Sequence, residues 1–164
     1  MNRKGFSLTE LIVVMGIIGI LLGIVTINFN DWQRKSQIER QTRELHADFN
    51  SARTDSIFRK TRHSVVVNTD GTGYVMRRYS SPDEATSAGT TIATRQTTYL
   101  LTKLNGTYFG ALEGIFMFDI RGTTNDLNTI RINPINSGAA FDCIVIHTVR
   151  TNLGKMEGGA CVQK

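Results

Sequence analysis

One apolar run, Leu11–Ile27, limits what this chain can fold into more than any other feature. Its seventeen residues (LIVVMGIIGILLGIVTI) carry no charge. As a helix they would reach about 26 Å, the short end of a membrane span. Arg3 and Lys4 precede the run, so the positive-inside bias keeps the N-terminus in the cytoplasm and sends the rest of the chain across the membrane. The sequence therefore predicts a single-pass inner-membrane protein with a periplasmic remainder.

A secretory signal peptide is the alternative reading of this N-terminus. Such a signal is cut after its apolar region at small residues in an A-x-A-like pattern. The sequence after Ile27 reads NFNDW and continues with charged residues, so it offers no such site. The small residue beside the charged leader is Gly5, which precedes the apolar run. A cut there removes residues 1–5 and leaves the apolar helix on the mature chain.

Glu10 lies at the edge of the apolar run. An ionised carboxylate in that position is costly and by default marks a function with a partner. A cut after Gly5 creates an α-amino group on Phe6, and this amine can pair with Glu10 of a neighbouring copy when helices pack side by side. A harmless, solvated acid at the level of the lipid headgroups is the alternative.

Residues 4–10 (KGFSLTE), followed by the apolar helix, resemble the class III signal of type IV pilins and type II secretion pseudopilins. The resemblance implies cleavage after Gly5 by a membrane prepilin peptidase and methylation of the Phe6 amine. It also implies that Glu10 guides docking into a helical filament. Many major pilins carry a proline near the end of this apolar half, and this chain has none there.

The second half of the predicted helix is amphipathic. Small or apolar residues recur at spacings of four and three, which keeps one helix face continuous: Ile38, Thr42, Leu45, Phe49, Ala52 and Ser56. No proline interrupts residues 6–62, so one helix of about 55 residues is expected. Within its apolar half, Gly19 and Gly23 form a Gly-x-x-x-Gly pair that lets helices approach closely, although glycines are also simply common in such helices.

Short strands are predicted after the helix. Residues 64–68 and 74–79 read as a hairpin around a turn at 69–73, and Ser80–Thr91 reads as a polar loop. Further strand candidates are residues 97–101, 106–109, 114–118, 129–135 and 143–149. The fold class is α+β, with a long N-terminal helix packed on an antiparallel β-sheet head. The expected parts are a leader at 1–5, a transmembrane and assembly helix at 6–29, the amphipathic second half at 30–62 and the head at 63–164.

The head carries a second, looser resemblance. Phe116–Gly122, Thr129–Ile132 and Leu153–Lys155 are similar to the head of the GspH/FimT group of minor pilins and pseudopilins. Together the two resemblances imply a structural subunit of a type IV pilus or a type II secretion pseudopilus, located at or near the tip. Its expected partners are the prepilin peptidase, other pilins or pseudopilins, and the inner membrane.

Cys143 and Cys161 both fall in the translocated part, where an oxidising environment allows a disulfide. The closed loop of 18 positions would be worth about 3 kcal/mol in the chain-entropy model. Two unrelated buried thiols are the alternative. A metal site is not predicted, because His46, His63 and His147 show no ligand spacing around the cysteines.

Nothing in the sequence predicts an enzyme or a cofactor. The chain has no Gly-x-Ser-x-Gly elbow, no His-Glu-x-x-His motif and no phosphate-binding glycine loop. A plain membrane-anchored periplasmic binding domain that never assembles remains a different class of function. Cleavage at Phe6 would exclude it.

DNA binding in natural transformation is a further alternative, because some FimT-like minor pilins bind DNA through a C-terminal Gly-Arg-x-Arg segment. This chain has GKME at 154–157, which keeps one basic residue and replaces the other with an acid. DNA is therefore not the favoured partner, and any binding should be weak and salt-sensitive. The candidate contacts are Arg131, Arg150, Lys155 and Lys164.

Overall fold

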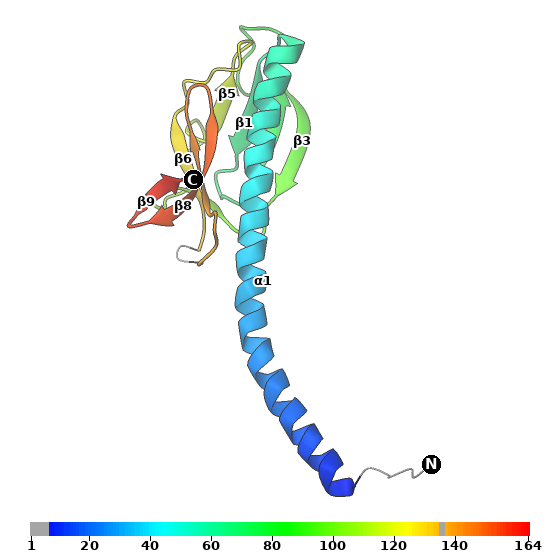
Figure 1. Cartoon of the computed structure of the whole chain (residues 1–164). Coiled ribbons are helices and arrows are strands. Elements are labelled where there is room, and N and C mark those ends of the chain that lie inside the picture. The colour runs from blue at the N-terminus through cyan, green and yellow to red at the C-terminus, as the bar shows by residue number, and fades with distance from the viewer. Residues whose placement is uncertain (1–6, 135–136) are drawn as a thin grey trace. The chain divides into compact units, whose positions relative to one another are not determined.

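The structure is a computed structural model that describes residues 7–134 and 137–164, with the side chains of residues 24–28 left out. Within these residues one helix precedes nine strands (Figure 1). The helix α1 spans Leu8–Arg59. The strands are β1 His63–Val67, β2 Gly73–Arg78, β3 Thr90–Gln96, β4 Leu101–Lys103, β5 Ile115–Phe118, β6 Asn128–Ile132, β7 Cys143–Ile146, β8 Thr151–Glu157 and β9 Ala160–Gln163. The chain divides into two compact units, Met1–Arg34 and Lys35–Lys164.

The helix α1 confirms the prediction of one long, uninterrupted helix. It begins after Ser7, whose carbonyl oxygen accepts the amide hydrogen of Leu11 at 3.2 Å. It ends at Arg59, where Lys60 adopts a left-handed backbone conformation with φ of 54°. A left-handed residue after the last helical turn is a common way to stop a helix without proline.

The amphipathic stripe of α1 is buried as predicted. All six of its residues are almost inaccessible to solvent: Ile38, Thr42, Leu45, Phe49, Ala52 and Ser56. The two hydroxyl groups of the stripe are satisfied by the helix itself, since Thr42 donates to the Ile38 carbonyl oxygen and Ser56 to that of Arg53. The stripe can therefore be buried without leaving a polar group unpaired.

The head contains two antiparallel sheets, where the sequence predicted one. The first has the order β3-β2-β1-β5 and the second β4-β6-β7-β8-β9. The predicted hairpin is β1 and β2, with Val65 opposite Met76. The predicted fold class, a long helix on an antiparallel β head, is confirmed, and both sheets contribute to one core.

Several predicted strand positions were wrong. Of residues 97–101 only Leu101 lies in a strand, and residues 106–109 form no strand. The strand β3 begins at Thr90, inside the predicted loop, and β8 and β9 were missed. β3 is exposed on both faces along most of its length, so it has none of the alternation that identifies a half-buried strand.

Aromatic side chains fill the centre of the head. Phe49 of α1 packs edge-on against Phe116 and Phe118 of β5, with ring centroids 5.3 and 6.2 Å apart. Phe109 extends the cluster, since its ring lies 6.0 Å from that of Phe116. Edge-to-face aromatic pairs of this kind add stability beyond the area they bury.

Polar contacts fix α1 to the first sheet. The buried Tyr74 hydroxyl of β2 donates to the Asp48 carboxylate at 2.8 Å, and Arg95 Nε of β3 donates to the same oxygen at 3.1 Å. Burial and the hydrogen bond to Asp48 raise the pKa of Tyr74, so the phenol remains a neutral donor. Gln41 also fixes the segment between β3 and β4, because its side-chain amide donates to the Tyr99 carbonyl oxygen and accepts the Tyr99 amide hydrogen.

Two phenylalanines of α1 provide a matched test of this packing. Phe49 is completely buried, whereas Phe58 is 80% exposed. Phe49→Ala should lower the free energy of unfolding by about 3–5 kcal/mol, because it leaves a cavity between α1 and β5. Phe58→Ala should change it by less than about 0.5 kcal/mol. Urea denaturation of the full chain in detergent would measure both, and similar losses would contradict this account of the core.

Candidate functional site

The first turn of α1 presents Glu10 to solvent. Ser7 and Thr9 share a hydrogen bond between their hydroxyl groups at 2.8 Å, and the Glu10 amide donates to the Ser7 carbonyl oxygen at 3.1 Å. An acid in the first helical turn is favourable because it faces the positive end of the helix dipole. The predicted cleavage residues Gly5 and Phe6 lie outside the described residues.

The beginning of α1 exposes a continuous apolar surface. Its large side chains are exposed on every face of the helix: Leu8, Leu11, Ile12, Val13, Val14, Met15, Ile17, Ile18, Ile20, Leu21 and Leu22. A Cβ atom added at Gly16 or Gly19 would meet no atom within 4 Å, so packing within this chain does not require glycine there. An apolar surface of this extent marks an interaction site.

Across the residues that the structure describes, no helix combines the length and the apolar character needed to cross a membrane.

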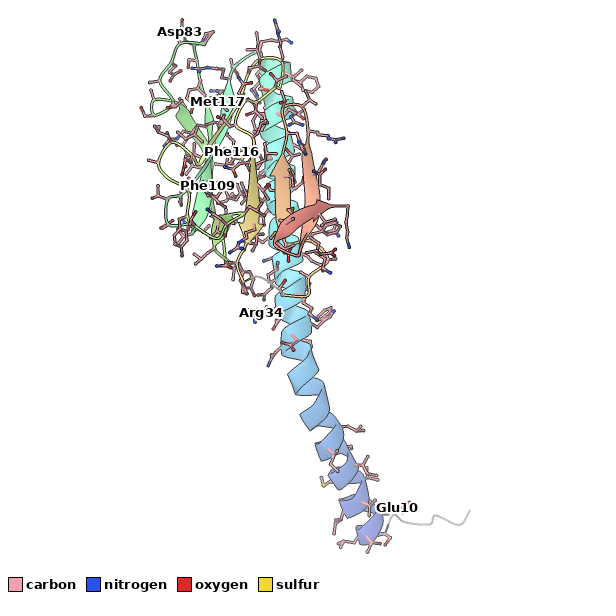
Figure 2. All side chains as sticks on the ribbon, turned by 90° about the vertical axis from the view of Figure 1, so that its left-hand side faces the viewer. Glu10, Arg34, Asp83, Phe109, Phe116 and Met117 are labelled. Atoms are coloured by element: carbon pink, nitrogen blue, oxygen red, sulfur yellow. A yellow bond between two sulfur atoms is a disulfide. The ribbon has the colours of Figure 1, made fainter. Side chains whose placement is uncertain are left out.

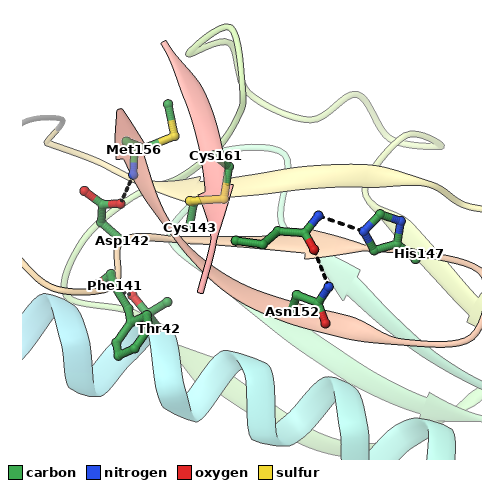
Figure 3. The surroundings of a disulfide bond; sticks show 9 residues. Thr42, Phe141, Asp142, Cys143, His147, Asn152, Met156 and Cys161 are labelled. Carbon is green, nitrogen blue, oxygen red and sulfur yellow. Dashed lines mark hydrogen bonds between the residues drawn. A yellow bond between two sulfur atoms is a disulfide. The ribbon is translucent and has the colours of Figure 1, made fainter. Parts of the chain in front are cut away.

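The disulfide predicted between Cys143 and Cys161 is present in the structure (Figure 3). Cys143 lies in β7 and Cys161 in β9, with β8 between them in the sheet. Two strand spacings would separate them by about 9.6 Å in a flat sheet, whereas their Cα atoms are 6.1 Å apart. The strand β9 is therefore bent across β8.

Gly154 lies directly under this crossing. A Cβ atom at this position would be 2.5 Å from Cys161 Sγ, 2.8 Å from the Val162 carbonyl oxygen and 3.2 Å from Cys143 Sγ. No side chain fits in that space. The disulfide and the backbone of β9 together therefore require glycine at this position.

A buried carboxylate, Asp142, joins the start of β7 to β8 and was not identified from the sequence. It is 2% exposed, accepts the Met156 amide hydrogen at 2.7 Å and donates its own amide hydrogen to the Gly154 carbonyl oxygen. Burial raises the pKa of its carboxyl above the ordinary value. Only its position before an apolar strand could have drawn attention to it.

The four candidate DNA contacts do not form one cluster of free cations. The Arg131 guanidinium donates to Thr102 Oγ1 at 3.1 Å and to the Leu104 carbonyl oxygen at 3.2 Å, toward β4. Lys155 pairs with Glu157 at 3.3 Å.

The remaining two lie elsewhere on the second sheet. Arg150 lies in the β7–β8 turn, at the opposite end of β8 from Lys155. Lys164 follows the edge strand β9, where its amide donates to the Leu153 carbonyl oxygen.

The three histidines have separate surroundings. His46 Nε2 lies 2.9 Å from the Thr151 carbonyl oxygen and links α1 to β8. His63 is buried in β1, and His147 Nε2 lies 3.0 Å from the Gln163 amide. Among the described side chains, no group of three or more His, Cys, Asp or Glu could hold a metal ion.

Comparisons with known proteins support both the N-terminal motif and the fold. Residues 1–26 match the family model described as the prokaryotic N-terminal methylation motif. The type IV minor pilin FimU of Pseudomonas aeruginosa strain PAO1 has a similar structure, with a TM-score of 0.53 and 13% sequence identity over 81% of this chain and 98% of that one. The chain therefore carries the N-terminal methylation motif and shares the fold of that minor pilin. No curated protein shows a significant match to it.

The need for glycine at position 154 can be tested together with the disulfide. Gly154→Ala should destabilise the oxidised protein by about 1–3 kcal/mol, because the methyl group overlaps the Cys161 sulfur. In a Cys143→Ala/Cys161→Ala background the same change should cost less, although the Val162 carbonyl oxygen still opposes it. Denaturation of the four variants forms a double-mutant cycle. An equal cost in both backgrounds would show that the disulfide does not impose the glycine.

Asp142 should make the stability of the head depend on pH. Because its folded-state pKa is raised, the protonated form favours folding below the unfolded pKa near 3.8, and this contribution is lost as the pH rises through the folded pKa. Asp142→Asn keeps an acceptor for Met156 without the charge. It should melt at a higher temperature than wild type at neutral pH and at the same temperature under strongly acidic conditions. Thermal unfolding across this range is the measurement, and a less stable variant at neutral pH would contradict it.

Proposed function

We propose that this protein is a minor pilin or pseudopilin, a structural subunit rather than an enzyme. Prepilin peptidase would cut it after Gly5, its Phe6 amine would be methylated, and α1 would carry it into a type IV pilus or a type II secretion pseudopilus, at or near the tip. The observation that supports this most is the exposed apolar surface of Leu8–Leu22, which lies within the residues that match the N-terminal methylation motif. A surface of this kind needs other helices or lipid to cover it.

The proposed parts follow from the sequence. Residues 1–5 form the leader, 6–29 the membrane and assembly helix, 30–62 its amphipathic continuation and 63–164 the head. Before assembly the chain would sit in the inner membrane, with its N-terminus in the cytoplasm and its head in the periplasm. The disulfide in the head supports a periplasmic location of the head, because such bonds persist in an oxidising compartment.

Membership of the GspH/FimT group is part of this proposal. The aromatic strand β5 is followed by a turn in which Asp119 accepts the amide hydrogens of Arg121 and Thr123. Gly122 has φ of 76°, a conformation that favours glycine. The Asp-x-Arg-Gly segment therefore forms a turn with a structural role, and its hydrogen bonds give no reason to assign it to catalysis. DNA binding is not proposed, since Arg131 and Lys155 are already engaged within the head.

Glu10 is proposed to pair with the Phe6 amine of a neighbouring subunit. The carboxylate is exposed in the described part of the chain, and it lies in the first turn, four positions from the proposed new N-terminus. Side-by-side packing of two apolar helices would bury both charges together. Breaking such a pair by removing one partner leaves an unpaired buried charge, which is strongly destabilising for the assembly.

The test is processing followed by assembly, with prepilin peptidase and the partner pilins present. Mass spectrometry should show a mature chain that starts at Phe6 and carries one added methyl group, and Gly5→Val should accumulate as uncut precursor. Glu10→Gln should be cut and folded but depleted from sheared filaments. Glu44→Gln, an acid-to-amide change on the exposed face of the same helix, should assemble normally. Intact Met1 in assembled material, or normal assembly of Glu10→Gln, would contradict the proposal.

A further inference from the structure

Two exposed aromatic side chains, Phe29 and Trp32, lie on α1 after the apolar run. They are 52% and 63% exposed, and their ring centroids are 6.0 Å apart. The spacing of three positions places both rings on one side of the helix. Trp32 is the single tryptophan of the chain. Neither ring contributes to the core of the head, so the fold of that domain does not explain them.

Charged residues lie at both ends of the segment of α1 from Glu10 to Arg34. Glu10 lies at the beginning of α1 and Arg34 lies further along the same helix (Figure 2). In the sequence Asp31 and Arg34 flank Trp32, and no charged residue lies between Glu10 and Asp31. At 1.5 Å per residue, Glu10 and Arg34 are about 36 Å apart along the helix. The hydrocarbon core of a bilayer is about 30 Å thick, so this separation can place both charges in the headgroup layers. The aromatic pair then falls at the boundary between hydrocarbon and headgroups.

We propose that Phe29 and Trp32 form an aromatic anchor that binds the headgroup boundary of a phospholipid bilayer, on the side where the head is translocated. The inference rests on the membrane stage of the proposed function. An indole ring suits this boundary because its body is apolar and its N–H can donate to a headgroup oxygen. Arg34, two positions beyond Trp32, supplies a cation for the lipid phosphates.

The anchor would set how far the helix sinks before assembly. A helix with apolar residues alone can slide along the bilayer normal, whereas interfacial aromatic side chains fix its depth. If a second copy of the helix covered these rings in place of lipid, Trp32 would lie in a different environment.

The test uses Trp32 fluorescence in the full chain, inserted into vesicles of phosphatidylethanolamine and phosphatidylglycerol. Lipids brominated near the headgroup should quench Trp32 more than lipids brominated at the chain ends. Aqueous iodide should quench it less after insertion, and its emission should shift to shorter wavelength. The control is Trp32→Phe combined with Phe58→Trp, which moves the single tryptophan to an exposed position near the C-terminal end of α1. Its emission should remain open to iodide and unaffected by brominated lipid.

Three results would overturn the anchor. Strongest quenching by bromines at the chain ends would place Trp32 at the bilayer centre, and full access to iodide would place it in water. A blue-shifted emission that no brominated lipid quenches would place the rings against another helix. Flotation of the vesicles separates these failures from failure of the proposed function, because a chain that does not float with them has no membrane stage. Cleavage after Gly5 is read independently by mass spectrometry.

Discussion

The head depends on one stripe of α1 that packs against both of its sheets. Neither sheet closes on itself, and each has an apolar face that water would otherwise reach. The stripe from Ile38 to Ser56 covers the apolar face of each sheet, with Phe49 at the centre. Polar contacts on the same helix then fix its rotation. Asp48 binds the first sheet through Tyr74, and His46 contacts β8 of the second sheet.

The side chains of α1 lie in two different environments along the helix. From Lys35 onward its buried side chains contact residues of the same chain, so they serve folding. From Leu8 to Leu22 its apolar side chains are exposed, so they are available to serve association. A change such as Phe49→Ala therefore acts on the free energy of unfolding. Under the proposed function a change at Glu10 should act on assembly instead, because its side chain is exposed.

Local patterns predicted the features that depend on local spacing. The helix, its buried stripe, the β1–β2 hairpin and the Cys143–Cys161 pair could all be read from periodicity, turn residues and compartment. The split into two sheets could not, because it depends on which distant strands pair, such as β1 with β5. β3 was not predicted because both of its faces are mostly exposed, so its residues show no alternation of apolar and polar side chains. Asp142 and Gly154 matter because of contacts with residues of neighbouring strands that are distant in the sequence, so no local sequence pattern identifies them.

The bent strand β9 has a consequence for contacts between separate molecules. An open sheet ends in a row of backbone groups that can pair with a strand from another molecule, which is a common start of aggregation. The second sheet ends in β9, and its disulfide to β7 pulls this last strand across its neighbour. A short strand fixed by a covalent bond in a twisted position is a poor template for such pairing. The cross-link can therefore hinder the pairing of β9 with a strand of another molecule.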